Sequence, residues 1–242
     1  MNARLKVDAW RRRLGFALLP PTCLLCGGAG AQQRDLCDGC STDLVPNPRA
    51  CERCALPLTT SDALCGRCLK RAPAFDAAWA PYLYESPLDL LLTRFKFGAD
   101  LACGRVLSEL AVARYAQAQR PPADALVPVP LHHTRLRERG CNQALELARL
   151  IAASLHIPLL GNVLNRVRAT SPQTGLGALA RRRNLRGAFA TNPGAAIPRR
   201  IILIDDVMTT GTTLGECARV LKRAGAEHVQ VWAIARAPRR RG

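Results

Sequence analysis

The sequence predicts an α/β fold in which helices cover both faces of a parallel sheet, preceded by a small cysteine-rich domain. After residue 120, apolar segments alternate with segments of helical periodicity. This alternation is typical of parallel sheets, because the crossover helices bury both faces of the strands. Before residue 72, eight cysteines occur in four CxxC pairs. The 242 residues are 48% hydrophobic and 22% charged, a composition that supplies a core and argues against disorder.

The charge of the chain is strongly positive. It contains 35 Lys and Arg residues against 18 Asp and Glu residues, which gives a formal net charge of +17. Most of the cations are Arg, whose planar guanidinium grips phosphate through two hydrogen bonds. This balance favours a polyanionic partner, such as nucleic acid or a polyphosphate.

Residues 1–20 predict a short amphipathic helix, with Leu5, Trp10 and Leu14 on its buried side. Its apolar run is shorter than a usual signal peptide requires, and no segment reaches the roughly 18 apolar residues of a membrane span. We therefore expect a cytoplasmic protein without a membrane span. In that reducing compartment, clustered cysteines indicate a metal site more often than disulfides.

Each CxxC pair is typical of a zinc knuckle, since two thiolates on one tight turn reach one ion and a second pair completes the tetrahedron. The pairs begin every 14 residues, which leaves both a sequential and an interleaved pairing open. Thiolates fill all four positions in either case, so we expect two structural zinc sites in a domain at 21–72. Because basic residues surround the CxxC pairs, the alternative to a purely structural role is that the knuckles bind nucleic acid. The expected ligands are Cys23, Cys26, Cys37, Cys40, Cys51, Cys54, Cys65 and Cys68.

The elements of the second domain, at 73–242, follow from apolar runs for strands and from three-to-four-residue apolar spacing for helices. The pattern predicts, in order, a strand at 78–84, helices at 86–96 and 101–118, a strand at 125–129 and a helix at 142–155. It continues with a strand at 163–167, a weakly periodic Arg- and Gly-rich segment at 168–187, a buried strand at 201–204, a helix at 213–224 and a strand at 229–234. The Arg-rich tail at 236–242 is expected to be frayed.

The segment at 201–214 carries the clearest functional pattern. A buried strand runs into Asp205 and Asp206, a loop of threonines and one glycine follows, and then a helix begins. Ligands bind at the carboxyl ends of parallel strands, where hydroxyls and the N–H groups of a helix start form a phosphate cradle. The two acids can accept hydrogen bonds from vicinal hydroxyls, so the pattern indicates a ribose 5-phosphate. The cradle residues are Thr209, Thr210, Gly211, Thr212 and Thr213.

This segment resembles the 5-phosphoribosyl 1-pyrophosphate (PRPP) loop of type I phosphoribosyltransferases. The rest of the chain resembles the ComF family (ComFC/GntX-like proteins) in particular. The motifs that carry this resemblance, besides the CxxC pairs, are Phe95-Lys96-Phe97-Gly98, Val127–Leu131 through Arg139–Gln143, Pro172–Leu176 and Arg183–Phe189. Cys141 departs from the family, since relatives often carry an aromatic residue there.

The resemblance implies a type I phosphoribosyltransferase-like sheet whose site residues bind PRPP. Asp205 and Asp206, the expected catalytic residues, would hold the ribose hydroxyls, and the threonine loop would enclose the 5-phosphate. Mg²⁺ would be carried by the pyrophosphate. Residues 130–143 would form the pyrophosphate side of the site, and a hood at about 163–190 would close over PRPP.

Three cations in the pyrophosphate-side segment suit a polyanion: Arg135, Arg137 and Arg139. The alternative for this run is a solvated, basic start of a helix. Arg181–Arg183 in the hood would either reach the site or bind nucleic acid.

Two functions share this site. The first is a phosphoribosyltransferase whose donor is PRPP and whose acceptor the sequence does not identify, acting in DNA uptake, natural transformation or nucleotide salvage. The second is a non-catalytic competence protein that binds single-stranded DNA under the control of PRPP. The resemblance implies single-stranded DNA and a ComFA-like helicase as partners. Phe95 and Phe97, which flank Lys96, are the best candidates to stack on bases, with burial in the core as the alternative.

Overall fold

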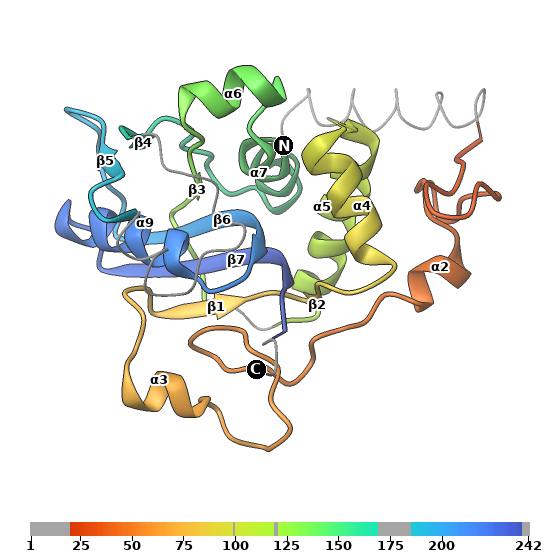
Figure 1. Ribbon diagram of the computed structural model, residues 1–242, viewed down its shortest axis with the longest axis horizontal. Coiled ribbons are helices and arrows are strands. Elements are labelled where there is room, and N and C mark those ends of the chain that lie inside the picture. The colour runs from red at the N-terminus through yellow and green to blue at the C-terminus, as the bar shows by residue number, and fades with distance from the viewer. Residues whose placement is uncertain (1–19, 99, 119–120, 169–184, 239–242) are drawn as a thin grey trace.

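Five parallel strands form the central sheet of the computed structural model, which describes residues 20–98, 100–118, 121–168 and 185–238 (Figure 1). The strands are β1 (Ala77–Trp79), β2 (Tyr82–Leu83), β3 (Ala125–Pro128), β6 (Arg200–Met208) and β7 (His228–Arg236). Their order is β1-β7-β6-β3, and β2 also pairs with β7. Every pairing in this sheet is parallel, so the predicted α/β architecture is confirmed.

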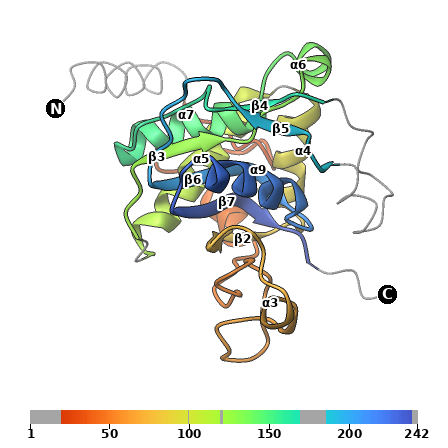
Figure 2. The same cartoon turned by 90° about the vertical axis from the view of Figure 1, so that its left-hand side faces the viewer.

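Helices cover both faces of the sheet (Figure 2). One face carries α4 (Leu88–Phe97), α5 (Leu101–Ala116) and α7 (Gln143–Leu155), and the other carries α9 (Thr212–Arg223) with the antiparallel pair β4 (Leu164–Arg166) and β5 (Phe189–Thr191). Because successive strand residues point to opposite faces, β6 contributes to two hydrophobic cores. Ile202 and Ile204 pack with the first group of helices, and Ile201 and Leu203 pack with α9.

The two halves of the cysteine-rich segment join different cores. The first half, with α2 (Asp38–Thr42), lies beside α4 and α5 in Figure 1 and contributes Leu36 to their core. The second half, with α3 (Gly66–Lys70), lies below β1 in the same view. Its four cysteines pack in the core that contains Phe75 and the residues of α9.

Two predicted strands differ from the observed ones by more than two residues at an end or by a break. The strand predicted at 201–204 is β6, which continues to Met208, because the backbone of Asp205 and the residues after it stays paired with β7. The apolar pattern from which the strand was predicted ends at Asp205, but the hydrogen-bonded pairing of β6 with β7 continues to Met208. The single strand predicted at 78–84 is split into β1 and β2 at Ala80 and Pro81, since proline has no N–H to donate to a ladder.

The basic segments show one agreement with an expected alternative and one correction. The segment at 130–143 contains a helix, α6 (His133–Arg139), whose N-terminus is capped by His132; a helix start was the alternative for this run. Arg236 was expected in a frayed tail, but it is the last residue of β7 and only 3% exposed. Three predicted features lie outside the described residues. They are the helix at 1–20, of which only Pro20 is described, the centre of the hood with Arg181–Arg183, and residues 239–242 of the tail.

Candidate functional site

The carboxyl end of β6 leads into a short loop and then into α9. Gly211 stands directly before the helix with φ +73°, in the left-handed region that glycine adopts without strain. A Cβ at this position would lie 2.7 Å from Met208 Cε. The N-cap residue Gly211 has no side chain that could cap α9, so the N–H groups of the first turn face the loop. This is the chemistry that binds a phosphate at a helix start.

Threonine hydroxyls surround this helix start. Thr210 Oγ1 lies 2.7 Å from Thr212 Oγ1, and the N–H of Thr212 donates to Thr210 Oγ1 at 3.4 Å. Thr209 is exposed at the rim, and Thr213 belongs to the first turn of α9. The structure therefore brings all five residues of the predicted cradle together at one end of the sheet.

Asp205 and Asp206 lie in β6 just before the loop, on opposite sides of the strand. Asp206 is 6% exposed, and its Oδ2 lies 3.1 Å from Lys96 Nζ. Withdrawal from water, followed by the negative charge of Asp206, raises the pKa of Asp205 to about 7. Lys96 at the end of α4 is the countercharge of the pair. Burial alone would lower the pKa of Lys96, but the attraction of Asp206 and Asp205 outweighs it and raises that pKa.

The three predicted arginines of α6 have different surroundings. Arg139 lies with its guanidinium 5.6 Å from the centre of the Phe97 ring, and its Nη1 donates to Gln143 Oε1 at 3.5 Å. Gln143 in turn donates to the Lys96 carbonyl at 3.4 Å, so Arg139 is held close to the Lys96–Asp206 pair. Arg135 is half-buried, and Arg137 is exposed.

Two basic residues near the acids were not predicted as site residues. Lys96 belongs to the motif Phe95-Lys96-Phe97-Gly98, one of those that carry the family resemblance. Its position between two aromatic residues could have marked it as a site residue. Arg166 on β4 lies over the Phe189 ring at 5.5 Å. Burial and the charge of Arg135 lower the pKa of Arg166, while Asp205 acts in the opposite direction. No sequence pattern marked Arg166, because it stands beside the weakly periodic segment.

Phe95 and Phe97 differ in their exposure to solvent. Phe95 is fully buried in the core with α5, whereas Phe97 is 73% exposed. Of the two aromatic residues considered for stacking, only Phe97 is therefore at the surface.

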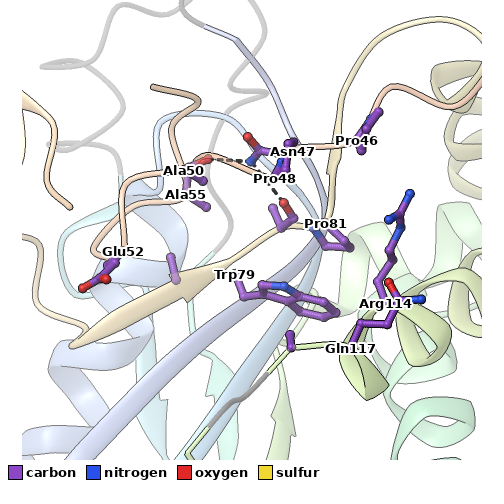
Figure 3. Close-up of a pocket in the computed structure, with 13 residues that line it drawn as sticks. Pro46, Asn47, Pro48, Ala50, Glu52, Ala55, Trp79, Pro81, Arg114 and Gln117 are labelled. Atoms are coloured by element: carbon purple, nitrogen blue, oxygen red, sulfur yellow. Dashed lines mark hydrogen bonds between the residues drawn. The ribbon is translucent and has the colours of Figure 1, made fainter. Parts of the chain in front are cut away.

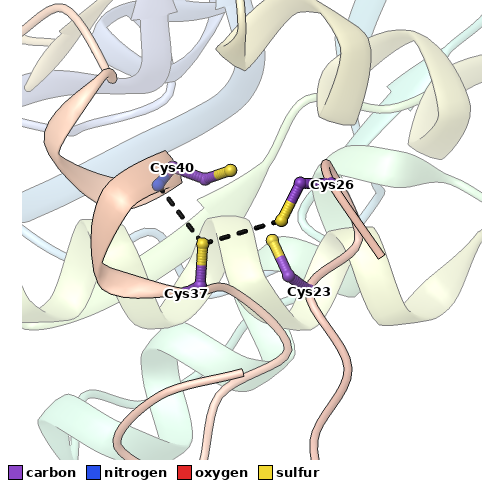
Figure 4. Close-up of side chains that lie close together, drawn as sticks. All are labelled: Cys23, Cys26, Cys37 and Cys40. Atoms are coloured by element: carbon purple, nitrogen blue, oxygen red, sulfur yellow. Dashed lines mark hydrogen bonds between the residues drawn. The ribbon is translucent and has the colours of Figure 1, made fainter. Parts of the chain in front are cut away.

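The eight cysteines of the CxxC pairs form two clusters, each with four sulfur atoms within 4.8 Å of one another. The first cluster contains the first two pairs (Figure 4), and the second cluster contains the last two. The sequential pairing is thus confirmed, and the interleaved alternative is wrong.

The spacing of the sulfur atoms fits zinc. Cys26 Sγ lies 3.8 Å from Cys37 Sγ, and Cys54 Sγ lies 3.7 Å from Cys65 Sγ. A tetrahedron with Zn–S bonds of about 2.3 Å has edges of about 3.8 Å. Four thiolates leave no position for water or substrate, so both are structural zinc sites.

A separate pocket of about 320 Å³ lies between residues 46–55 of the cysteine-rich segment, the β1–β2 connection and the end of α5 (Figure 3). Trp79, Arg114 and several prolines line it. Asn47 at its wall donates from Nδ2 to the carbonyls of Ala55, at 3.0 Å, and Ala80, at 3.1 Å. The bond to Ala80 fastens the cysteine-rich segment to the connection between β1 and β2, whereas the bond to Ala55 stays within that segment. None of the predicted site residues lines this pocket.

In the part of the chain that the structure describes, no helix has both the length and the apolar character needed to cross a bilayer.

Two protein families match the chain. The double zinc ribbon domain matches residues 16–69, and the phosphoribosyl transferase domain matches residues 142–242. Competence protein F of Haemophilus influenzae is 38% identical over 222 residues, which cover 89% of this chain and 96% of that protein. DNA utilization protein YhgH of Escherichia coli strain K12 is 36% identical over 160 residues, covering 63% of this chain and 69% of YhgH. Competence protein ComFC of Bacillus subtilis strain 168 is 31% identical over 144 residues, covering 60% and 57% respectively.

Proposed function

Since this chain belongs to the ComF family of phosphoribosyltransferase-like proteins, we propose that it binds PRPP at the carboxyl end of β6 and acts in DNA uptake or nucleotide salvage. The observation that carries the proposal is one continuous segment with two adjacent carboxylates, a glycine at positive φ and a start of α9 surrounded by threonine hydroxyls. Relatives named for competence and DNA utilization support the role in DNA uptake. We place this activity in the cytoplasm. We also propose a zinc domain at 21–72 and a PRPP domain at 73–242, with a hood at about 163–190.

Each part of PRPP meets a group of matching chemistry. The hydroxyls of the threonine loop and the N–H groups at the start of α9 hold the 5-phosphate. Asp205 and Asp206 accept hydrogen bonds from the two ribose hydroxyls, which requires Asp205 to be ionised. Lys96 compensates the charge of Asp206 and orients its carboxylate in the absence of substrate, because its Nζ lies 3.1 Å from Asp206 Oδ2.

The pyrophosphate lies toward α6 in this proposal, where Arg139 is held by Gln143 and Arg135 is half-buried. Arg137 is exposed and adds long-range attraction. Mg²⁺ bound to the pyrophosphate would neutralise its charge and make it a better leaving group. Lys96 already neutralises Asp206, so the acid pair is poorly suited to be a cation site by itself. We therefore propose that the metal arrives with the substrate.

If the protein is a transferase, the bond between ribose C1 and pyrophosphate breaks as the acceptor attacks C1. The side chains described above act by positioning and by stabilising charge. Incubation with PRPP, Mg²⁺ and a panel of nucleobases should then release pyrophosphate. PRPP binding without release across the panel would favour the non-catalytic role.

The test of the binding site is calorimetric titration of the zinc-loaded protein with PRPP and Mg²⁺. We expect wild-type protein to bind and the Asp205→Asn/Asp206→Asn double variant to lose binding, with unchanged zinc content. Asp43→Asn/Glu85→Gln is a charge-matched control, because both side chains are exposed and neither belongs to the proposed site. Wild-type affinity in the Asp205/Asp206 variant would overturn the proposal.

A second function, binding of single-stranded DNA, is favoured by the exposed Phe97 ring beside Arg139 and by the net charge of +17. A flat ring next to a guanidinium stacks on a base while the cation holds the phosphate backbone. We propose this surface as the DNA contact of either the enzyme or the non-catalytic protein. A ComFA-like helicase would be the partner that handles the same strand.

A further inference from the structure

We infer that the second cysteine cluster, formed by Cys51, Cys54, Cys65 and Cys68, is a scaffold for the phosphate loop, and that Arg236 is the positioning residue that connects them. The phosphate loop denotes residues 208–213. Zinc in this cluster then supports substrate binding from a distance, whereas zinc in the first cluster does not. This inference rests on the proposed function of the loop as a phosphate site.

Arg236 joins the two sites through one buried guanidinium. Its side chain lies at the end of β7, where Arg236 is the register partner of Met208, and the residue is 3% exposed. Its Nε donates to the Cys54 carbonyl at 2.9 Å. Its Nη1 donates to the Met208 carbonyl at 2.9 Å and also to the carbonyl of Thr209. A turn that holds a zinc ligand is therefore fixed to the first two residues of the phosphate loop.

A second arginine continues this pattern along the loop. Arg67 lies in α3 between two cysteines of the second cluster, and its Nη2 donates to the Thr210 carbonyl at 3.2 Å. Three successive loop carbonyls, at residues 208, 209 and 210, thus accept hydrogen bonds from arginines that belong to the second cluster or contact it.

Fixing these carbonyls also fixes the N–H groups of the loop. In a planar trans peptide, the C=O of one residue points opposite to the N–H of the next. Carbonyls that turn toward the second cluster make the N–H groups of residues 209–211 turn away from it. An array of N–H groups on one side of a loop is a binding site for an anion. The arginines therefore set the orientation on which phosphate binding depends.

Apolar packing supports the same face of the loop. Phe75 is buried in one core with the four cysteines of the second cluster. Its Cζ would lie 3.7 Å from a Cβ on Gly211. Arg53, which stands between Cys51 and Cys54, donates to the Phe75 carbonyl at 3.1 Å and to the Asp76 carbonyl at 2.6 Å. Loss of metal from the second cluster would free Arg53 and Cys54 together and loosen the support of the loop.

The first cluster offers an internal control, because its contacts run to the other face of the sheet. Arg105 of α5 pairs with Asp35, and Arg34 Nε lies 3.4 Å from Glu109 Oε2 of α5. The two clusters have the same ligands but pack in different cores. Loss of either one removes one zinc, so their effects on the phosphate loop can be compared directly.

The test measures hydrogen–deuterium exchange of the peptide that spans residues 208–213, and calorimetric affinity for ribose 5-phosphate, in the full-length zinc-loaded protein. Arg236→Gln should raise exchange in this peptide and weaken ribose 5-phosphate binding by about tenfold or more, because the guanidinium's hydrogen bonds to Cys54 and to two loop carbonyls are lost, together with its bond to the Ala237 carbonyl. Arg236→Lys keeps the charge without the planar fork, so it should restore only part of the affinity. Arg223→Gln, an exposed arginine at the end of α9, should behave as wild type.

The two clusters are then compared through Cys68→Ser and Cys40→Ser, with zinc measured by mass spectrometry. Each variant should lose about one zinc, but only Cys68→Ser should raise exchange at residues 208–213 and weaken ribose 5-phosphate binding. If Cys68→Ser does not fold, Arg67→Gln removes the exposed contact to Thr210 alone and should raise exchange in the same peptide. Equal exchange in the wild type and in Arg236→Gln would overturn the inference. Failure of wild-type protein to bind ribose 5-phosphate would instead overturn the proposed function, because the exchange comparison does not need a ligand.

Discussion

Asp205 and Asp206 place two carboxylates next to each other in a strand at the middle of the sheet. Two neighbouring charges in partly desolvated surroundings oppose folding unless a cation compensates them. Lys96 compensates one of them directly, and the pKa of Asp205 still rises to about 7. Asp205 thus weakens the folded state that carries it, which is expected of a group retained for a ligand.

The replacement Asp205→Asn should stabilise the protein while it removes PRPP binding. The folded-state pKa of Asp205 is about 7, whereas an unfolded Asp titrates near 3.9. The folded state therefore holds the proton more tightly, and ionisation of Asp205 costs stability progressively as the pH rises from about 4 to about 7. Asn has no proton to lose, so the free energy of unfolding of the variant should exceed that of the wild type by up to about 4 kcal/mol at pH 8.

Urea unfolding of both proteins at pH 5 and at pH 8 measures this difference. The gain in free energy of unfolding should be much smaller at pH 5, where the wild-type carboxyl keeps its proton. Asp62→Asn, an exposed replacement, should change the stability by less than about 0.5 kcal/mol at both values. A gain for Asp205→Asn that does not depend on pH would show that the carboxyl titrates normally.

At the scale of elements, the connection from β6 to α9 depends on one backbone conformation. Gly211 adopts φ +73°, which costs a residue with a Cβ about 1 kcal/mol. The Cβ would also displace Met208, the residue whose carbonyl Arg236 holds. A change at Gly211 therefore acts on the loop shape as well as on stability.

Gly211→Ala should lower the stability by about 1 kcal/mol and weaken PRPP binding by about tenfold. Gly194→Ala is a matched control, because Gly194 has the same φ of +73° and nothing lies within 4 Å of its added Cβ. The control should lose similar stability and keep full affinity. Calorimetry with PRPP and Mg²⁺ on both variants separates the two effects, and equal affinities would contradict a role of the loop in binding.

The local pattern of the sequence predicted most elements and the acids, glycine and threonines of the loop. Apolar runs and helical spacing mark α7, α9 and β3 because short-range packing decides them. The same pattern missed the continuation of β6 through its acids, since the ladder with β7 is a long-range interaction. It also missed Lys96 as the partner of Asp206, and Arg236 as the partner of Cys54, 182 residues away. Basic residues in an Arg-rich chain carry no local sign of which carbonyl or carboxylate they meet.

At the scale of the whole molecule, the net charge of +17 predicts attraction to any polyanion, so charge alone cannot identify a DNA site. Phe97 is more informative, because it is 73% exposed and lies beside Arg139. Stacking and phosphate contacts respond differently to salt, which separates the two contributions.

Single-stranded DNA binding should weaken steeply with salt, with a slope of log K against log salt of about −0.7 for each phosphate contacted. Phe97→Ala should lower the affinity at every salt concentration without changing the slope, since stacking is uncharged. Arg139→Gln should reduce the slope by about 0.7. Leu69→Ala, which replaces an equally exposed apolar residue of α3, should change neither quantity. Fluorescence anisotropy over a salt series measures all four proteins, and a flat salt dependence would exclude the DNA role.

The position of β7 in the sheet has a consequence for biosynthesis. Among the strands of this sheet, β7 comes last in chain order, yet it lies between β1 and β6 at the centre of the sheet. Both cysteine clusters precede the strand against which they rest, so during synthesis they can collect metal before that strand exists. Neither core can close until β7 has been made, and a chain terminated before β7 would expose both cores to proteases.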